Sequence, residues 1–158
     1  MTTESSVLVL GIGNILLGDE GVGVHVVRHL QGLDPPGLQC LDGGTGSLTL
    51  LEPMQSASSL VVVDATADGR PPGSLACLRP RFASDFPPSL TAHDIGLRDL
   101  VESFYLLGQV PEVTLFTVSI TWPQEMGLDL SPEVAAAVPE LALRILQEVG
   151  RASDQPVR

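Results

Sequence analysis

The feature that most constrains the fold is a short apolar run that opens into a glycine-rich loop. Residues 6–11 read S-V-L-V-L-G, and the loop that follows is rich in glycine from Gly13 to Gly23. An unbroken run of Val and Leu stopped by Gly indicates a strand that is buried on both faces. Apolar residues then recur at helical spacing over residues 19–33. The segment therefore predicts a central strand that leads through a tight loop directly into a helix.

Strand-like and helix-like segments alternate over the rest of the chain. Short apolar or β-branched runs predict further strands at residues 38–41, 60–64, 74–78 and 113–120. Helical spacing and N-cap signals predict helices at residues 45–54, 94–107 and 132–149, the last of which Pro139 should kink or split. This alternation predicts an α/β fold, a single three-layer α/β/α sandwich with a twisted, mostly parallel sheet of about five strands. We expect residues 1–158 to form one domain, with an ordered core over about residues 6–150.

The charge of the chain excludes whole classes of partner. Its eight basic side chains are all arginine, against 19 Asp and Glu, for a net charge of -11. A protein that binds nucleic acid or an anionic membrane surface needs a basic patch on its own surface, so we expect neither as a partner. No apolar run approaches the ~20 residues that span a bilayer, and the N-terminus lacks the basic residues of a secretory signal. We therefore expect a cytoplasmic location.

The glycine-rich loop does not match a nucleotide site. In the dinucleotide fingerprint G-x-G-x-x-G that would start at Gly11, Leu16 stands where the third glycine belongs. Asp19 and Glu20 follow where a pyrophosphate needs backbone N–H groups, and their charge would repel it. A P-loop requires a lysine, which the chain lacks. We therefore expect no nucleotide cofactor.

Three side chains at element boundaries are the candidates for chemistry. Glu20 stands at the start of the first helix, Asp64 ends an apolar strand, and His93 precedes the third predicted helix. Ligands of open α/β sheets bind beyond the carboxyl ends of the strands, so these residues can meet in one cleft. Two carboxylates and a neutral imidazole suit a divalent transition metal with open coordination positions. The same groups also suit general acid–base work without a metal, and their spacing leaves both alternatives open.

Simpler structural roles compete with this interpretation. Asp19 is the expected N-cap of the first helix, and Glu20 would then be a second favourable charge at the helix start. Asp64 can cap the turn that follows its strand. The segment Asp42-Gly43-Gly44-Thr45 ends the second strand with paired glycines, which fits a tight turn with Thr45 capping the next helix.

Five segments in order carry a family resemblance. They read G-I-G-N-I-L-L-G-D-E-G-V-G at 11–23, D-G-G-T at 42–45, V-V-V-D-A at 61–65, H-D-I-G-L at 93–97, and G-L at 127–128 leading into L-S-P-E-V at 130–134. On these segments the sequence resembles the hydrogenase maturation proteases, which trim the C-terminus of the large subunit of nickel-iron hydrogenases. The resemblance covers about residues 7–149 and implies a single α/β peptidase domain, in agreement with the pattern of strands and helices.

The resemblance also implies roles for particular residues. Glu20, Asp64 and His93 correspond to the catalytic and metal-contacting residues of the family, and Asp42, Gly43, Gly44 and Thr45 would line the substrate cleft. The implied activity is that of an aspartyl or metal-dependent endopeptidase that removes a short C-terminal peptide from a nickel-loaded large-subunit precursor. Family members recognise nickel already installed in the precursor and cleave after a basic residue, so the divalent metal would be nickel contributed by the substrate.

We expect a monomer whose partner is this hydrogenase large-subunit precursor. One alternative stays open, a non-proteolytic, chaperone-like module that recognises the metal of a metalloprotein precursor without cutting the chain.

Overall fold

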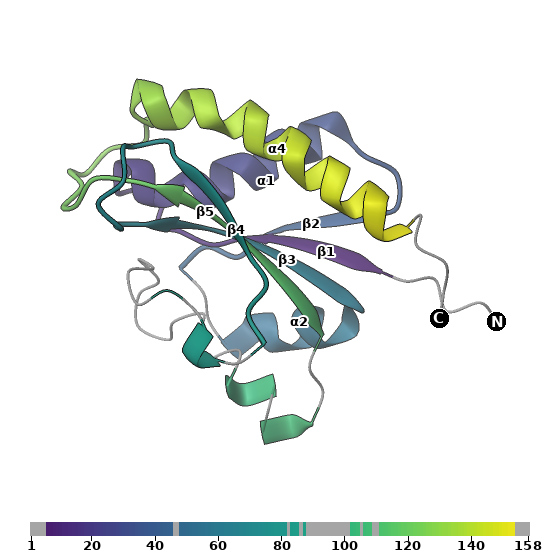
Figure 1. Ribbon diagram of the computed structural model, residues 1–158. Helices are drawn as coiled ribbons and strands as arrows, with labels where there is room; N and C mark the ends of the chain where they lie inside the picture. The colour runs from purple at the N-terminus through teal and green to yellow at the C-terminus, as the bar shows by residue number, and fades with distance from the viewer. Residues whose placement is uncertain are drawn as a thin grey trace.

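The protein is built on a five-stranded, mostly parallel sheet (Figure 1). The computed structural model describes residues 6–45, 48–81, 83–85, 87, 102–104, 106–108 and 111–153. The strands are β1 (Val7–Gly11), β2 (Leu38–Asp42), β3 (Ser59–Thr66), β4 (Leu75–Leu78) and β5 (Glu112–Ser119). They lie in the order β2-β1-β3-β5-β4, and all neighbours are parallel except β4 and β5 at one edge. The predicted sheet is confirmed, and each strand begins and ends within about two residues of the predicted positions.

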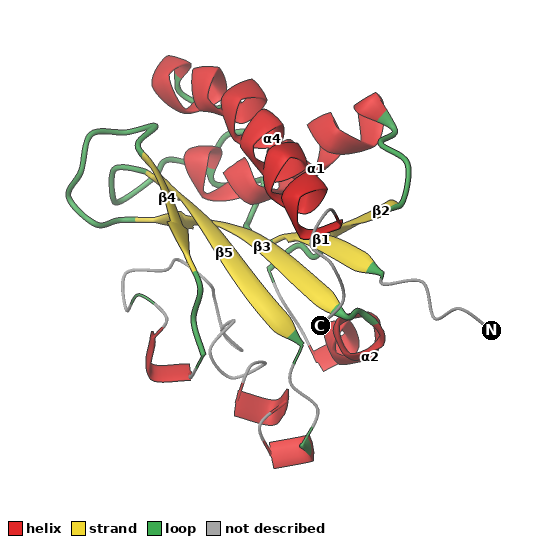
Figure 2. Ribbon diagram, turned by 45° about the vertical axis from the view of Figure 1, so that its right-hand side comes forward, coloured by secondary structure: helices red, strands yellow, loops and turns green. Residues whose placement is uncertain are grey.

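Helices cover both faces of this sheet, which confirms the α/β/α sandwich (Figure 2). α1 (Val22–Leu33) and α4 (Pro132–Ser153) lie together on one face, and α2 (Leu51–Ser56) lies on the other. A 3-10 turn, η1 (Gly18–Gly21), precedes α1 and joins it to the loop after β1. The first strand therefore leads into the first helix through a short, tightly wound connection, as the sequence predicts.

Two of the predicted helices are reproduced in part. The helix expected from residue 45 begins later, as the 3-10 turn η2 (Leu48–Leu50) followed by α2. The helix expected over residues 94–107 lies largely outside the described residues. The described part of this segment, residues 102–104 and 106–107, is helical. Phe104 from this segment is buried in the same apolar cluster as Met54 of α2. Phe104 and α2 therefore belong to the same helical layer.

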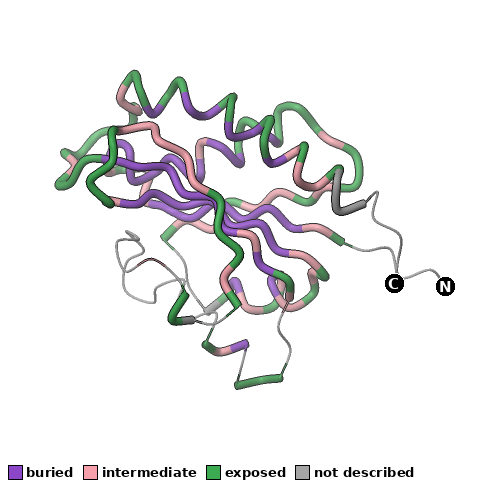
Figure 3. Tube along the Cα trace, in the orientation of Figure 1, coloured by how far each residue is buried: buried purple, intermediate pink, exposed green. Residues whose placement is uncertain are grey.

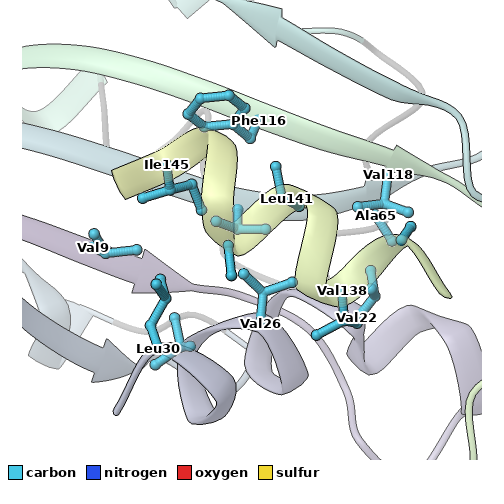
Figure 4. Close-up of a cluster of buried hydrophobic side chains, with 14 of the residues drawn as sticks. Val9, Val22, Val26, Leu30, Ala65, Phe116, Val118, Val138, Leu141 and Ile145 are labelled. Carbon is cyan, nitrogen blue, oxygen red and sulfur yellow. The ribbon is translucent and has the colours of Figure 1, made fainter. Parts of the chain in front are cut away.

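Each face of the sheet has its own apolar core, because successive side chains of a strand point to opposite faces. In β1, Val9 belongs to the cluster that includes α1 and α4, whereas Leu8 and Leu10 belong to the cluster that includes α2. The middle of the sheet is buried (Figure 3), which confirms a first strand covered on both sides. Figure 4 shows the first cluster, where side chains of both helices meet those of the strands. Burying one such side chain contributes about 1.5–3 kcal/mol to folding.

α4 is one continuous helix although it contains Pro139. Of the two effects predicted for this residue, a kink or a split, the split is therefore wrong. Pro139 removes the backbone donor for the carbonyl of Ala135, but both residues are exposed, so water can satisfy that carbonyl. Val138 and Leu141 pack into the core on either side of the proline and hold the helix in place. None of the described helices combines enough length with enough apolar character to cross a membrane.

Glycine at position 23 lets α1 approach the sheet closely. A Cβ atom on Gly23 would lie 2.4 Å from the carbonyl oxygens of both Ile12 and Val63. Gly11 faces the helix in the same way, since its Cβ atom would lie 2.2 Å from the carbonyl oxygen of Gly23. Larger residues would push the helix away from the strands, because protein interiors are close-packed. This close approach places η1, at the start of α1, against β3 at the carboxyl edge of the sheet.

Candidate active site

Asp64 lies near the carboxyl end of β3 and is fully buried, with 0% of its surface exposed. Its Oδ1 atom accepts a hydrogen bond of 2.8 Å from the backbone N–H of Ala65. Its Oδ2 atom is buried and has no hydrogen-bond partner among the described residues. Burial raises the pKa of Asp64 to about 8; the Ala65 N–H opposes this shift, and the charge of Glu20 adds to it. At neutral pH this carboxyl group therefore mostly keeps its proton.

Glu20 brings a second carboxyl group to the same place. It belongs to η1, just before α1, and only 1% of its surface is exposed. Its backbone N–H donates to the carbonyl oxygen of Leu17 at 3.1 Å. η1 contacts β3, and the charge of Glu20 acts on Asp64 by raising its pKa. The structure therefore brings these two sequence-predicted residues together, buried at the carboxyl edge of the sheet.

The third candidate, His93, lies outside the described residues. Within the part of the chain that the structure describes, no three His, Cys, Asp or Glu side chains are grouped so that they could hold a metal ion. Of the three candidate ligands, Glu20 and Asp64 lie within the described residues. A cation bound by them would favour their ionised forms, because its charge offsets the burial and the repulsion that raise the pKa of Asp64. On this ground the pair fits a divalent cation.

The turn after β2 reaches the site through Gly13. The N–H of Gly43 donates to the carbonyl oxygen of Gly11 at 2.8 Å, and the N–H of Gly13 donates to that of Gly44 at 2.7 Å. Gly13 in turn lies against η1, since a Cβ atom there would be 2.1 Å from the carbonyl oxygen of Glu20. The loops after β1 and β2 are therefore bonded together beside the buried carboxylates.

The polar residues of this turn face outward. Asp42 and Thr45 are both exposed. The Oδ1 atom of Asp42 accepts from the N–H of Gly44 at 2.9 Å, and its Oδ2 atom lies 3.6 Å from a guanidinium nitrogen of Arg28. Gly44 has a φ of 53°, in the left-handed region that glycine adopts without strain. The predicted tight turn is confirmed, whereas the predicted capping of the next helix by Thr45 is wrong, because the next helical turn begins only at Leu48. The outer side chains of the turn can contact a bound polypeptide.

Asp19 is not the N-cap of α1, so that prediction is wrong. Gly21 occupies the N-cap position, and no side chain caps this helix start. The carboxylate of Asp19, 3% exposed, instead accepts hydrogen bonds from the N–H of Ser131 at 2.7 Å and from its hydroxyl at 2.8 Å. The N–H of Asp19 donates to Oε1 of Gln124 at 3.1 Å. Asp19 therefore joins the turn that carries Glu20 to the loop between β5 and α4.

Neither Gln124 nor Ser131 is predicted from the sequence to lie near the site. They lie 105 and 112 residues from Asp19, and no local pattern links such distant positions. The one signal was the segment from residue 127 to residue 134, which forms part of the family resemblance although it is far from Glu20 in the chain.

Two kinds of chemistry are open to the buried carboxyl pair. A cation bound by Glu20 and Asp64 would keep other coordination positions free for a substrate. Asp64 can also hold a proton at neutral pH and exchange it, as a general acid or base does. Both kinds of chemistry belong to hydrolytic sites.

Comparisons with known proteins agree with one another. A family model described as HycI, hydrogenase maturation protease, matches residues 24–148. The chain is 32% identical over 151 residues to the hydrogenase 2 maturation protease of Escherichia coli (strain K12), covering 91% of this chain and 92% of that protein. It is 34% identical over 160 residues to the hydrogenase expression/formation protein HupD of Thiocapsa roseopersicina, covering 95% of this chain and 72% of that protein. The solved structure of the hydrogenase maturating endopeptidase HybD from Escherichia coli matches with a TM-score of 0.77 and 32% identity, over 94% of each chain.

Fold and site together define the class of protein, an α/β protein with a buried carboxylate site at the carboxyl edge of parallel strands. The family model and the similar proteins narrow this class to one family. The chain belongs to the hydrogenase maturation protease family, and it is a peptidase. The family resemblance and the fold predicted from the sequence are both confirmed.

Proposed function

We propose that this protein removes a short C-terminal peptide from the nickel-loaded large-subunit precursor of a nickel-iron hydrogenase, with Glu20 and Asp64 as catalytic residues. The observation that carries the proposal is the buried pair itself, in which Oδ2 of Asp64 has no partner among the described residues. A carboxyl group with a pKa of about 8 beside a second acidic side chain is costly to ionise without a cation. Membership of the family supports the reaction class.

The nickel ion is part of the substrate in this proposal. Glu20, Asp64 and His93 bind it when the loaded precursor arrives. A divalent ion polarises a carbonyl group or lowers the pKa of a water molecule. Its charge also lowers the pKa of Asp64, so this side chain releases its proton as the loaded precursor binds.

The same linkage distinguishes loaded from empty precursor. A precursor without nickel meets a protonated Asp64 and brings no charge to offset the burial of Glu20. Binding of the empty form therefore gains nothing from the carboxylates, whereas the loaded form gains the full interaction of a cation with its ligands. Selection by this difference makes cleavage a checkpoint that follows metal insertion.

The turn after β2 lines the cleft for the C-terminal tail of the substrate. Gly43 and Gly44 present backbone beside the loop after β1, so an extended tail can lie close to the carboxylates. The exposed carboxylate of Asp42 suits the basic residue after which family members cleave. The protein acts as a monomer in the cytoplasm, where its net charge of -11 disfavours nucleic acids and anionic membranes.

The test is to incubate the purified protein with nickel-loaded and nickel-free precursor and to weigh the products by mass spectrometry. We expect one C-terminal peptide to be lost from the loaded form alone. Asp64→Asn and Glu20→Gln should reduce this loss by roughly a hundredfold or more. Asp34→Asn, which changes an exposed carboxylate at the end of α1, should preserve it. Equal cleavage of both precursor forms would contradict the checkpoint. Tight binding of the loaded precursor by the wild type without cleavage would indicate the chaperone-like module instead.

A further inference from the structure

Two hydrogen-bonded loops form a continuous edge of the molecule next to the carboxylate site. One loop, residues 14–17, precedes η1, and the other, residues 120–131, joins β5 to α4. The N–H of Gly127 donates to the carbonyl oxygen of Leu16 at 2.8 Å, and the N–H of Gly18 donates to that of Gly127 at 2.9 Å. Figure 1 shows the light-green loop after β5 reaching past the end of that strand, beside the start of α1. The two loops therefore behave as one structural unit.

This unit exposes four large apolar side chains to solvent. Their exposed fractions are 54% for Leu16, 58% for Trp122, 82% for Met126 and 62% for Leu128. A single exposed apolar residue is ordinary, whereas several exposed apolar side chains on adjoining loops are typical of surfaces that bind other molecules. Figure 3 shows the loop after β5 as exposed over most of its length. We call these four side chains the two-loop surface.

The two-loop surface is tied to the carboxylate site by hydrogen bonds. The Nε2 atom of Gln124 donates to the carbonyl oxygen of Thr121 at 2.7 Å, and its Oε1 atom accepts from the N–H of Asp19 at 3.1 Å. Asp19 directly precedes Glu20, and its carboxylate accepts two hydrogen bonds from Ser131 at the other end of the loop. A polypeptide that covers the two-loop surface therefore lies beside Glu20.

The charge around this surface indicates the chemistry of its partner. Glu125 and Asp129 lie among the apolar residues and are both exposed, and residues 120–131 include no basic side chain. The matching partner presents apolar side chains bordered by basic ones. A second copy of this chain fits poorly, because its net charge of -11 would bring like charges together.

We propose that the two-loop surface docks the hydrogenase large-subunit precursor through an apolar segment bordered by basic residues. This inference rests on the proposed function, since it names where the same substrate is held outside the site of cleavage. The apolar side chains bind the precursor equally before and during the reaction, so they govern KM. The carboxylates contact the metal and the reacting groups, so they govern kcat.

The test is the steady-state cleavage of nickel-loaded precursor by the double variant Met126→Ser, Leu128→Ser. The matched control is Leu143→Ser, which removes a side chain that is 57% exposed on α4. All three side chains project into solvent, so these variants should fold. We expect the double variant to raise KM at least about tenfold with kcat within about twofold of the wild type, and the control to change neither. An unchanged KM, or a fall in kcat at unchanged KM, would overturn the inference.

A binding measurement separates failure of this inference from failure of the proposed function. The affinity of the nickel-loaded precursor is measured for the wild type and for the double variant. Should the wild type cleave the precursor and the double variant match it in both affinity and KM, docking on this surface is refuted while the proposed function stands. Should the wild type leave the precursor intact, the proposed function is refuted. The affinities then decide the inference, which is supported if the double variant binds at least about tenfold more weakly and refuted if it binds equally well.

Discussion

The carboxylate of Asp19 accepts two hydrogen bonds from Ser131, at 2.7 and 2.8 Å, across 112 residues of sequence. The same residue donates its backbone N–H to Gln124. Because Asp19 immediately precedes Glu20, these contacts fix the turn that carries Glu20 against the start of α4. Asp19 thus acts as a positioning residue for the site, in a role that its place before a helix does not reveal.

Ser131→Ala is expected to lower the free energy of unfolding by about 1.5–3 kcal/mol, because it removes a hydrogen bond to a buried carboxylate. Urea denaturation of the variant and of the wild type measures this difference. The control is Ser56→Ala, whose hydroxyl donates to the carbonyl oxygen of Glu52 at 2.9 Å on an exposed helix end. We expect the control to change stability by no more than about 0.5 kcal/mol. An equal decrease in the free energy of unfolding of the two variants would show that the hydrogen bond to Asp19 stabilises the protein no more than an exposed one does.

Two glycines of α1 provide a matched pair for the packing of helix against sheet. Gly23→Ala should destabilise the protein by about 2 kcal/mol or more, because the new Cβ atom would meet two carbonyl oxygens at 2.4 Å. Gly32 has no atom within 4 Å of a Cβ position, so Gly32→Ala should stabilise the helix by up to about 1 kcal/mol. Thermal or urea denaturation measures both changes. Similar effects of the two substitutions would contradict the close approach at Gly23.

The stability of the metal-free protein should depend on the protonation of Asp64. Burial raises the pKa of this group from 3.8 to about 8, so the folded state binds more protons than the unfolded chain between these values. The stability that this proton contributes is present in full below the lower value and is lost as the pH rises to about 8. We expect the free energy of unfolding to fall over this range by a few kcal/mol more in the wild type than in Asp64→Asn.

Urea denaturation at a series of pH values tests this expectation. Asp34→Asn serves as the control, because it makes the same Asp-to-Asn change at an exposed position and should leave the slope of the wild type unchanged. A profile for Asp64→Asn as steep as that of the wild type would mean that Asp64 is ionised in the folded protein near neutral pH.

Glu20→Gln has two expected effects. It removes the charge that helps to raise the pKa of Asp64, so the pH at which the stability profile levels off should move downward. It should also reduce cleavage of the loaded precursor by roughly a hundredfold or more, because a catalytic carboxylate is lost. Glu52→Gln, an exposed change on α2, should alter neither quantity. If Glu20→Gln kept both the pH profile of stability and the cleavage activity of the wild type, Glu20 would not belong to the site.

The parts of the fold that follow local rules could be predicted from the sequence. The run of Val and Leu before Gly11 identifies β1 because no polar side chain interrupts it, and the structure buries both of its faces. Glu20 and Asp64 could be predicted as site residues because ligands of parallel sheets bind at the carboxyl ends of the strands. Their closeness in the structure follows from the close packing of α1 on β1 and β3 at Gly23.

Interactions between distant parts of the chain could not be predicted in the same way. Asp19 carries every local sign of a helix N-cap, yet its partner Ser131 lies at the start of the last helix. Pro139 has the local signature of a helix break, but tertiary packing of Val138 and Leu141 keeps α4 continuous. In both cases a tertiary contact outweighs a local conformational preference. Such contacts between distant residues cannot be predicted from a single sequence.

The proposed mechanism depends on the binding, by Glu20 and Asp64, of a cation that the substrate supplies. The most direct test is the affinity of the wild type and of Asp64→Asn for nickel-loaded and nickel-free precursor, measured at neutral pH. We predict that the wild type binds the loaded form at least about tenfold more tightly than the empty form, and that Asp64→Asn binds both forms equally. Equal affinity of the wild type for the two forms, or an undiminished preference in Asp64→Asn, would contradict the account.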